Sequence, residues 1–421
     1  MLMRKQNNVI WITSLAAFLL SLPLIPSTDA VSARSDFSKD PNNWFGSLTP
    51  FVYGITPWND ATWFYVVSII QVVLFSFGLS LLFKRYKTSI FGLFPLTFFG
   101  ASFASWVIRD SLLFSLLIFS IGLIVANLKA LLYREKILIA FGFVTLLISL
   151  SIRPYLSISF AFLLFYVARK LAVKIQIILI LLLALVTGPF LIDSTFSKGL
   201  SQSDTYPLQQ VVIFDLAQMA CWSSNDEIRL QASEALNPIG RSSSIGELCG
   251  NLKPYNWQFA VSGENTDEAG ALKRLERNDV LLFRELVRDY LHLTIQRPDE
   301  ILKIKLRNLN ELLFVNGQFD GLEKSKSLNA GLFKILDKIH VFSWIVLIPI
   351  FLLWSIRFRP FGNISELRTG GSLVYAIFVA GLTMVPLISF FYVGAIGRYT
   401  FISTFLMALS LTASRGSKIT V

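Results

Sequence analysis

The chain has 421 residues, of which 54% are hydrophobic and 15% are charged, and its mean hydropathy is +0.60. Soluble domains carry about 25% charged residues, so this composition indicates a protein that lies largely in a lipid bilayer. The formal charge of +11 is not gathered in basic blocks with interleaved aromatics, which argues against nucleic acid as a partner. Two cysteines without a CxxC motif, and only two histidines, argue against zinc and iron–sulfur sites.

Ten apolar segments approach the roughly 20 residues that a helix needs to cross the hydrocarbon core. In chain order they are 9–28, 62–83, 88–108, 111–131, 137–152, 155–168, 175–194, 340–356, 372–393 and 400–414. The fifth and sixth are short, and we expect them to extend into flanking residues whose basic side chains reach the headgroups. The sequence therefore predicts an all-α polytopic membrane protein with about ten transmembrane helices.

These segments divide the chain into three parts. Residues 1–194 form an N-terminal membrane domain of about seven spans with a first outer loop at 29–61, and residues 340–421 form a C-terminal membrane domain of about three spans. Residues 195–339 have the composition of a soluble domain. We expect this middle part to be mostly helical and to lie between the seventh and eighth spans.

The first segment has two readings. It begins "MLMRKQNN", continues through an apolar stretch and ends in small residues, which also suits a cleaved secretory signal. Its apolar run is longer than that of most signals, so we favour a retained helix. Cleavage would leave nine spans with the same faces outside.

The basic residues of the short loops predict the orientation in the membrane. With the N-terminus in the cytoplasm, the inner loops hold sixteen basic and two acidic residues, and the outer short segments hold five basic and six acidic residues. This distribution follows the preference of Lys and Arg for the cytoplasmic side. The sequence thus predicts a multi-pass protein of the inner (plasma) membrane with both termini in the cytoplasm and 195–339 outside.

The predicted outer domain carries both cysteines, Cys221 and Cys249. An extracytoplasmic compartment is oxidising, so we expect them to form a disulfide, with two free thiols as the alternative. Two helices are predicted near its end. The first, within 279–295, would place Phe283, Leu286, Val287, Tyr290, Leu291 and Thr294 on one helical face. The second starts at Pro298 and carries a leucine stripe at 302, 306, 309 and 313, with Lys303, Lys305 and Arg307 around it.

Three predicted outer turns each carry an arginine, although loops on this face usually avoid basic residues. They are Arg109 (next to Asp110), Arg153 in "SIRPY" and Arg398 (next to Tyr399). Asp36, Asp40 and Asp60 add carboxylates on the same face, in the first outer loop.

Guanidinium groups at this level suit the phosphate of a polyprenyl-linked sugar, because the arginine fork matches phosphate oxygens. A nearby carboxylate can take the proton of an acceptor hydroxyl. We therefore predict Asp36, Asp40 and Asp110 as catalytic residues and Arg109, Arg153, Arg398 and Tyr399 as donor-binding residues. No cofactor is implied with certainty, and a divalent cation could bind the carboxylates.

Each of these residues also has a simpler explanation. Arg109 and Asp110 can pair with each other or with headgroups, and Arg153 and Arg398 can anchor helix ends at the interface. Asp40 precedes a proline and can start a turn, and Asp60 suits the N-cap of the second span.

The predicted cytoplasmic start, the acid-bearing first outer loop, the run of apolar hairpins and the late "RY" resemble the GT-C superfamily of polytopic glycosyltransferases. Within the outer domain, "FDLAQMACWSS" (214–224) followed by "FRELVRDYLHLTIQRPDEILKIKLRNL" (283–309) is similar to one bacterial group. The resemblance implies a polyprenyl-phosphate sugar donor, a glycan or lipid acceptor, a catalytic acid at Asp36 or Asp40, a second acid at Asp110, and donor-phosphate arginines at Arg398 and Arg153. Many members carry the soluble part at the C-terminus, whereas here it precedes the last three spans.

Three alternatives stay open. "IRDSLLFSLLIFSIGLI" with "SIRPY" also resembles O-antigen and exopolysaccharide polymerases, which share the donor class and the role of the arginines but need no carboxylate base. A transporter or flippase without chemistry and a non-enzymatic envelope assembly factor are the other two classes. Transporters favour charges within their spans and symmetric halves, neither of which this sequence indicates.

Overall fold

The computed structural model describes residues 2–24, 30–31, 34, 48–55, 62–84, 90–128, 133–171, 173–199, 209–240, 245–252, 261–262, 272–273, 275, 279–314, 370–391 and 397–414. Within these ranges the chain is helical apart from one pair of two-residue strands. The predicted all-α class is therefore confirmed for the described residues. The predicted span 340–356 lies outside them.

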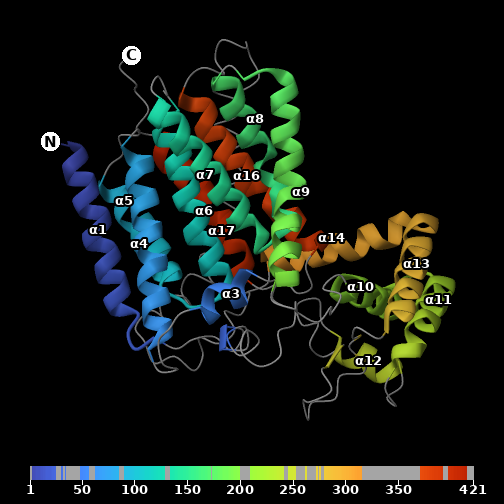
Figure 1. Ribbon diagram of the computed structural model, residues 1–421. Helices are drawn as coiled ribbons and strands as arrows, with labels where there is room; N and C mark the ends of the chain where they lie inside the picture. The colour runs from blue at the N-terminus through green and yellow to red at the C-terminus, as the bar shows by residue number, and fades with distance from the viewer. Residues whose placement is uncertain are drawn as a thin grey trace.

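The larger part of the molecule is a bundle of long helices (Figure 1). Its members are α1 (Leu2–Leu20), α4 (Trp63–Phe83), α5 (Ile90–Ala104), α6 (Arg109–Ala126), α7 (Tyr133–Ser151), α8 (Ala161–Lys170), α9 (Ile175–Gly199), α16 (Gly370–Phe391) and α17 (Gly397–Ser414). A short helix α3 (Leu48–Gly54) lies at one end of the bundle, and the 3₁₀ helix η1 (Pro154–Phe160) leads directly into α8.

Among the described residues of this bundle, three stretches are long and apolar enough to cross a membrane, namely Trp63–Phe83, Arg109–Ala126 and Ile175–Thr195. Shorter apolar stretches in the bundle are Gly92–Ala104, Pro154–Arg169, Leu373–Ile388 and Phe401–Ser410. The window from α9 is only 17% buried inside the protein, compared with 78% for the window from α6. An apolar helix with so little protein around it has the surface of a lipid-facing helix.

Two predicted helix boundaries differ from those in the structure for local chemical reasons. The first helix ends at Leu20 rather than at residue 28, just before Pro23, which has no backbone N–H to continue the helical hydrogen bonds. The segment predicted at 155–168 is a 3₁₀ helix followed by an α-helix, and Pro154 occupies its first turn. The N-cap of α4 is Thr62 rather than Asp60, which lies outside the described residues.

Consecutive bundle helices run in alternating directions, so the turn before α6 and the turn after α7 lie at the same end (Figure 1). The closest packing is between α4 and α6. A Cβ atom added at Gly78 would lie 2.5 Å from the Phe119 Cα, so only glycine permits this approach. Phe75, Phe114 and Phe405 fill the neighbouring core, with ring centroids 5.3 Å apart for Phe75–Phe114 and 4.8 Å apart for Phe114–Phe405.

A smaller helical domain projects from the same end of the bundle (Figure 1). It consists of α10 (Gln209–Trp222), α11 (Asp226–Leu236), η2 (Asn237–Ile239), α12 (Ile245–Asn251), α13 (Val280–Gln296), α14 (Pro298–Phe314) and the parallel strands β1 (Val261–Ser262) and β2 (Leu272–Lys273), with Val261 opposite Leu272. These elements have their own buried cluster, which includes Phe214, Leu216, Leu236, Leu286 and Leu293. The domain therefore has a hydrophobic core separate from that of the bundle.

Helix α14 joins the two parts. Ile304 belongs to the buried cluster of the smaller domain, whereas Leu309 packs against the buried cluster of the bundle, where α14 contacts α16. One helix therefore contributes to both cores.

The structure shows what two predicted helix faces in this domain meet. On the predicted face of α13, Leu286 is buried, whereas half of the surface of Leu291 is exposed; Leu293, which is not on that face, is buried. On α14 the leucine stripe does not face the domain core: Leu302 and Leu306 are exposed, and Lys305 is buried. The reason is the neighbour of each helix, because α10 covers the polar Lys305 face of α14 and supplies it with partners.

Candidate functional site

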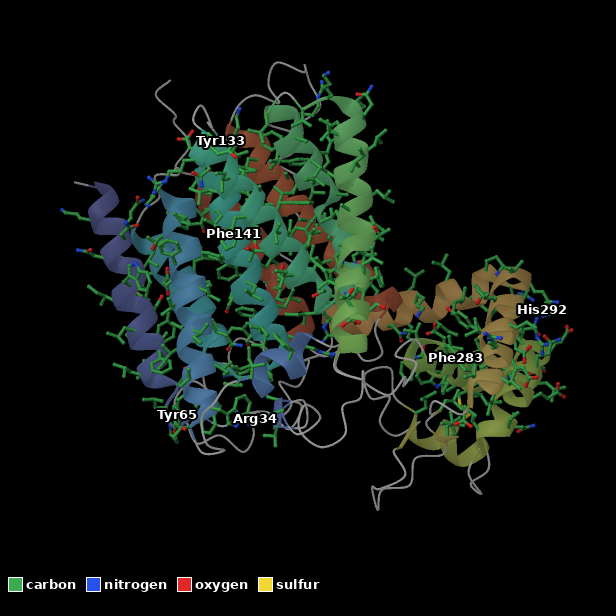
Figure 2. All side chains as sticks on the ribbon, in the orientation of Figure 1. Arg34, Tyr65, Tyr133, Phe141, Phe283 and His292 are labelled. Atoms are coloured by element: carbon green, nitrogen blue, oxygen red, sulfur yellow. A yellow bond between two sulfur atoms is a disulfide. The ribbon has the colours of Figure 1, made fainter. Side chains whose placement is uncertain are left out.

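The candidate site lies at the bundle end from which the smaller domain projects. Figure 2 shows Arg34 and Tyr65 at this end and Tyr133 at the opposite one. Asp110 is in the first turn of α6, where the extended backbone of the N-cap residue Ile108 ends the preceding turn. Arg153 is the N-cap residue of η1, and Pro154 follows it. A helix start favours a carboxylate near its exposed N–H groups, so the local position of Asp110 is itself favourable.

Asp110 and Arg153 form a buried ion pair. Arg153 Nε and Nη2 donate to Asp110 Oδ1 at 3.0 and 2.8 Å, and the two side chains are only 6% and 4% exposed for Asp110 and Arg153. Arg109 and Asp110 are neighbours at the start of α6, as the sequence predicted, and Asp110 forms an ion pair with Arg153, 43 positions later. Since a buried charge needs a partner, each residue stabilises the charge of the other.

Aromatic rings adjoin this level of the bundle and connect it with α17. The Phe401 ring stacks on Phe103 at 4.2 Å between centroids and meets Phe114 edge-on at 5.7 Å. Phe114 lies one turn after Asp110 in α6, and Phe401 lies one turn after Arg398 in α17. The backbone of Arg398 and Tyr399 is therefore at the same end as Asp110, whereas their side chains lie outside the described residues.

Hydroxyl groups line the turns at this end. Ser111 Oγ donates to the Phe103 carbonyl at 2.7 Å, and Ser68 Oγ donates to the Ser105 carbonyl at 2.6 Å, so the α5–α6 turn has its carbonyls bound. In η1, the buried Ser157 and Ser159 hydroxyls have no hydrogen-bond partner within the part of the chain that is described. They lie one to two turns after Arg153 and add polar groups to the same helix.

The remaining predicted site residues are placed only in part. Arg109 is half-buried at the start of α6. Asp36 and Asp40 lie outside the described residues, so the expected convergence of first-loop carboxylates with the arginines stays a prediction. Over the described ranges, no group of three or more His, Cys, Asp or Glu side chains is arranged to hold a metal ion. Arg34, in the same first loop, lies 4.9 Å from the centroid of the Trp63 ring.

The two cysteines predicted to pair form a disulfide, with an S–S distance of 2.07 Å. It joins the end of α10 to α12 across a separation of 28 residues.

A second buried polar cluster, within the smaller domain, was not predicted. Lys305 Nζ donates to Asp215 Oδ1 at 2.8 Å, and the Tyr290 hydroxyl donates to Asp215 Oδ2 at 3.0 Å. Burial raises the pKa of the Asp215 carboxyl above its usual value, although Lys305 acts in the opposite direction. Beside it, the Gln218 and Asn308 amides exchange hydrogen bonds at 3.2 and 3.1 Å. The only sequence signal was polar residues three apart on both helices.

Glu300 anchors the start of α14 to the end of α10. Its carboxylate accepts hydrogen bonds from Lys303 Nζ at 2.6 Å, Ser223 Oγ at 2.7 Å and Ser224 Oγ at 3.0 Å. The hydrogen bond from Lys303, followed by that from Ser223, lowers the pKa of Glu300 to about 2. These contacts hold α14 in register against α10.

A cavity of about 310 Å³ lies between α11 and α13. Its floor includes Leu286 and Leu293, and its walls include Glu234, Glu285, Asp289 and His292. This cavity is far from Asp110 along the fold, on the side of the smaller domain where Figure 2 labels His292. It has an acidic rim and an apolar floor.

Comparison with protein-family models, with curated proteins and with solved structures finds no match for the chain.

Proposed function

We propose that the chain is an integral membrane glycosyltransferase that moves a sugar or glycan from a polyprenyl-(pyro)phosphate carrier to an acceptor on the extracytoplasmic face. In this proposal about ten helices span the inner membrane, both termini are cytoplasmic and residues 195–339 are outside. The observation that carries it is the buried Asp110–Arg153 ion pair at the bundle end from which the disulfide-bonded domain projects. A buried ion pair thus lies at the end of the bundle that carries the disulfide-bonded domain, and disulfides persist in oxidising compartments outside the cytoplasm.

The ion pair supports a specific division of roles. A guanidinium held by two hydrogen bonds to one carboxylate keeps its plane and position, which is what phosphate recognition requires. In the proposed site, Asp110 positions Arg153, and Arg153 binds the carrier phosphate together with Arg398, Arg109 and Tyr399. Asp36 or Asp40 then takes the proton of the acceptor hydroxyl as the glycosidic bond forms and the carrier phosphate leaves. Because the pair is buried, donor entry includes a local opening between α6 and η1.

A polymerase of the O-antigen or exopolysaccharide type is the second candidate, and one observation favours it. Asp110 Oδ1 accepts two hydrogen bonds from Arg153, so this carboxylate is already committed to an arginine and is a poor proton acceptor. A polymerase of this type uses the arginines and needs no carboxylate base. The two candidates therefore differ at Asp36 and Asp40.

The proposal is tested by glycan profiling of a deletion strain complemented with variants. We expect Arg153→Ala and Arg398→Ala to abolish transfer, with Arg288→Ala, an exposed arginine of α13, as the matched control. Loss of activity in both Asp36→Asn and Asp40→Asn, or in one of them, favours the GT-C type, and full activity in the double variant favours the polymerase type. Full activity of both arginine variants would refute both candidates.

The orientation is tested separately by labelling introduced cysteines with a membrane-impermeant maleimide. Both native cysteines are joined in the disulfide, so an introduced cysteine is the one free thiol. Tyr133→Cys, at an 80% exposed site, should react only after the cells are opened, and Leu281→Cys, at a 75% exposed site, should react in intact spheroplasts. The reverse pattern would contradict the proposed topology.

A further inference from the structure

Helix α14 has an apolar face that the cores of the protein cover only at Leu309. Leu302, Leu306 and Leu309 recur at the spacing of one helical face. Leu309 packs against the bundle cluster, whereas Leu302 and Leu306 are 49% and 52% exposed. The side of α14 next to these leucines, with Lys305, and the opposite side, with Ile304 and Asn308, are buried. The leucine face of α14 is therefore packed against the bundle at Leu309 and exposed at Leu302 and Leu306.

Because α14 runs across the direction of the bundle helices, its leucine face stays at one height along the bundle axis. The helix leaves the bundle near the C-terminal end of α9 and runs across the direction of the bundle helices, as Figure 1 shows. At 1.5 Å per residue, Leu302 lies about 10 Å further from the bundle than Leu309 along the helix axis. If the bundle crosses a bilayer, a helix in this direction lies along the plane of the membrane.

The turn between α13 and α14 extends the same apolar surface. Leu291 and Ile295, in the last two turns of α13, are 50% and 77% exposed. In Figure 1, α13 meets α14 at the end of α14 that lies away from the bundle. Soluble surfaces scatter single exposed leucines, whereas here two consecutive helices each carry two large exposed apolar side chains, as surfaces that bind apolar partners do.

The charges around this surface favour lipid over a strongly charged partner. Arg297 pairs with Asp299 at 3.0 Å and Lys303 pairs with Glu300 at 2.6 Å, so these four charges cancel. Leu302 and Leu306 are the exposed large apolar side chains beside these pairs. An apolar face with mutually neutralised charges beside it matches the boundary between headgroups and acyl chains, where binding follows the buried apolar area.

We infer that α14 and the end of α13 rest in the outer leaflet of the membrane that the bundle spans, with Leu302, Leu306, Leu291 and Ile295 among the acyl chains. The occupant of this surface is the lipid bilayer itself. This inference depends on the proposed membrane topology. It also gives α14 a role in the proposed function, because a helix anchored in the leaflet holds the smaller domain at the level where a lipid-linked glycan emerges.

The experiment measures the depth of a fluorescent label in single-protein nanodiscs. Full-length variants Leu302→Cys and Leu306→Cys are labelled with an environment-sensitive NBD group, and lipids that carry a nitroxide near the headgroup or in the mid-chain act as quenchers. We expect both labels to emit at shorter wavelength than in solution and to be quenched by the shallow nitroxide more than by the deep one.

Leu281→Cys provides the matched control on the same domain. It is 75% exposed at the other end of α13, about 20 Å from Ile295 along the helix, so its label should stay in water and be quenched by iodide. If the labels at 302 and 306 behave like the label at 281, the inference is refuted. Protection from iodide without quenching by nitroxide lipids would mean that protein covers the surface, which also refutes it.

A label on α9 separates this result from a failure of the proposed topology. Leu183 is 63% exposed near the middle of α9. A label at Leu183→Cys should be quenched by the deep nitroxide if α9 spans the membrane. Quenching at 183 without quenching at 302 and 306 would refute only the inference about α14, whereas no quenching at 183 would remove the membrane topology and the inference together.

Discussion

Lys305 Nζ lies 2.8 Å from both carboxylate oxygens of Asp215, and these two side chains, 90 residues apart, are 3% and 1% exposed. The pair fixes α14 to α10 inside a domain whose remaining core is mostly apolar. A buried pair of this kind contributes little compared with apolar residues of the same shape, but the loss of one partner leaves a charge without compensation.

We therefore expect Lys305→Met to lower the free energy of unfolding of the smaller domain by about 3–5 kcal/mol. The double variant Asp215→Leu with Lys305→Met should recover most of this loss, because no buried charge remains. Pulse proteolysis of the full-length protein in detergent measures both. Arg288→Met is the control, since its exposed pair with Asp289 should contribute less than about 1 kcal/mol. Equal effects of Lys305→Met and Arg288→Met would contradict the prediction.

The Asp110–Arg153 pair should respond to substitution in a way that separates folding from function. Arg153→Ala leaves a buried carboxylate unpaired and should cost about 3–5 kcal/mol of bundle stability. Asp110→Leu combined with Arg153→Leu should restore the thermal midpoint but not the glycan transfer, because the phosphate-binding guanidinium is missing. A double variant that regains both stability and transfer would show that the pair serves only the fold.

The close approach of α4 and α6 makes Gly122 sensitive to a single methyl group. A Cβ atom at Gly122 would overlap the Gly78 carbonyl oxygen, which is backbone and cannot turn away. We expect Gly122→Ala to destabilise the bundle by about 1–3 kcal/mol, as overpacking does elsewhere.

Gly188→Ala in α9 is the matched control for this substitution. Its added Cβ would lie 3.6 Å from the Leu147 methyl groups, an ordinary contact. Because Pro189 follows Gly188 and disfavours a helical residue with a Cβ before it, alanine gains less helix propensity at 188 than at 122, so the difference between the variants is a lower limit on the packing cost at Gly122. Thermal unfolding in detergent measures the stability of both variants. A Gly122→Ala variant as stable as Gly188→Ala would argue against the close contact between α4 and α6.

Acidification should weaken the attachment of α14 through Glu300. The hydrogen bonds from Lys303 and Ser223 lower the Glu300 pKa from 4.5 to about 2 in the folded protein. A carboxyl whose folded pKa is lowered contributes stability that is fully present above its unfolded pKa and is lost as the pH falls toward the folded value. We expect the stability of the smaller domain to fall between pH 4.5 and about pH 2 through this group.

Glu300→Gln tests this origin of the acid sensitivity. The variant should be less stable than the wild type at neutral pH, and its stability should fall less over the same acidic range. Glu234→Gln, an exposed residue of α11, should keep the pH dependence of the wild type. If Glu300→Gln also keeps the full pH dependence, another group carries it.

The positions of the bundle helices could be read from the sequence because the signal is local. A run of apolar residues needs no partner to be recognised, and α4, α6 and α9 begin and end within a few residues of the predicted bounds. The α1 boundary differed because the apolar pattern continues past Pro23, whereas the hydrogen bonds of the helix do not.

The partners of charged residues could not be read in the same way. The sequence offered the neighbouring Arg109 as one simple partner for Asp110. The structure shows a partner that no local pattern indicates, Arg153, because the turns before α6 and after α7 meet at one end of the bundle. Asp36 and Asp40 lie outside the described residues, so their predicted place beside the arginines rests on the sequence.

The amino-acid sequence by itself determined the helical class of the described chain, the run of apolar helices and the expectation of a disulfide between Cys221 and Cys249. Only the tertiary structure decided that Lys305 is buried and that Leu302 and Leu306 face outward. Periodicity shows which residues share a helix face, but it does not show what that face meets. On α14 the neighbour is α10, whose Asp215 and Gln218 make the polar face the buried one.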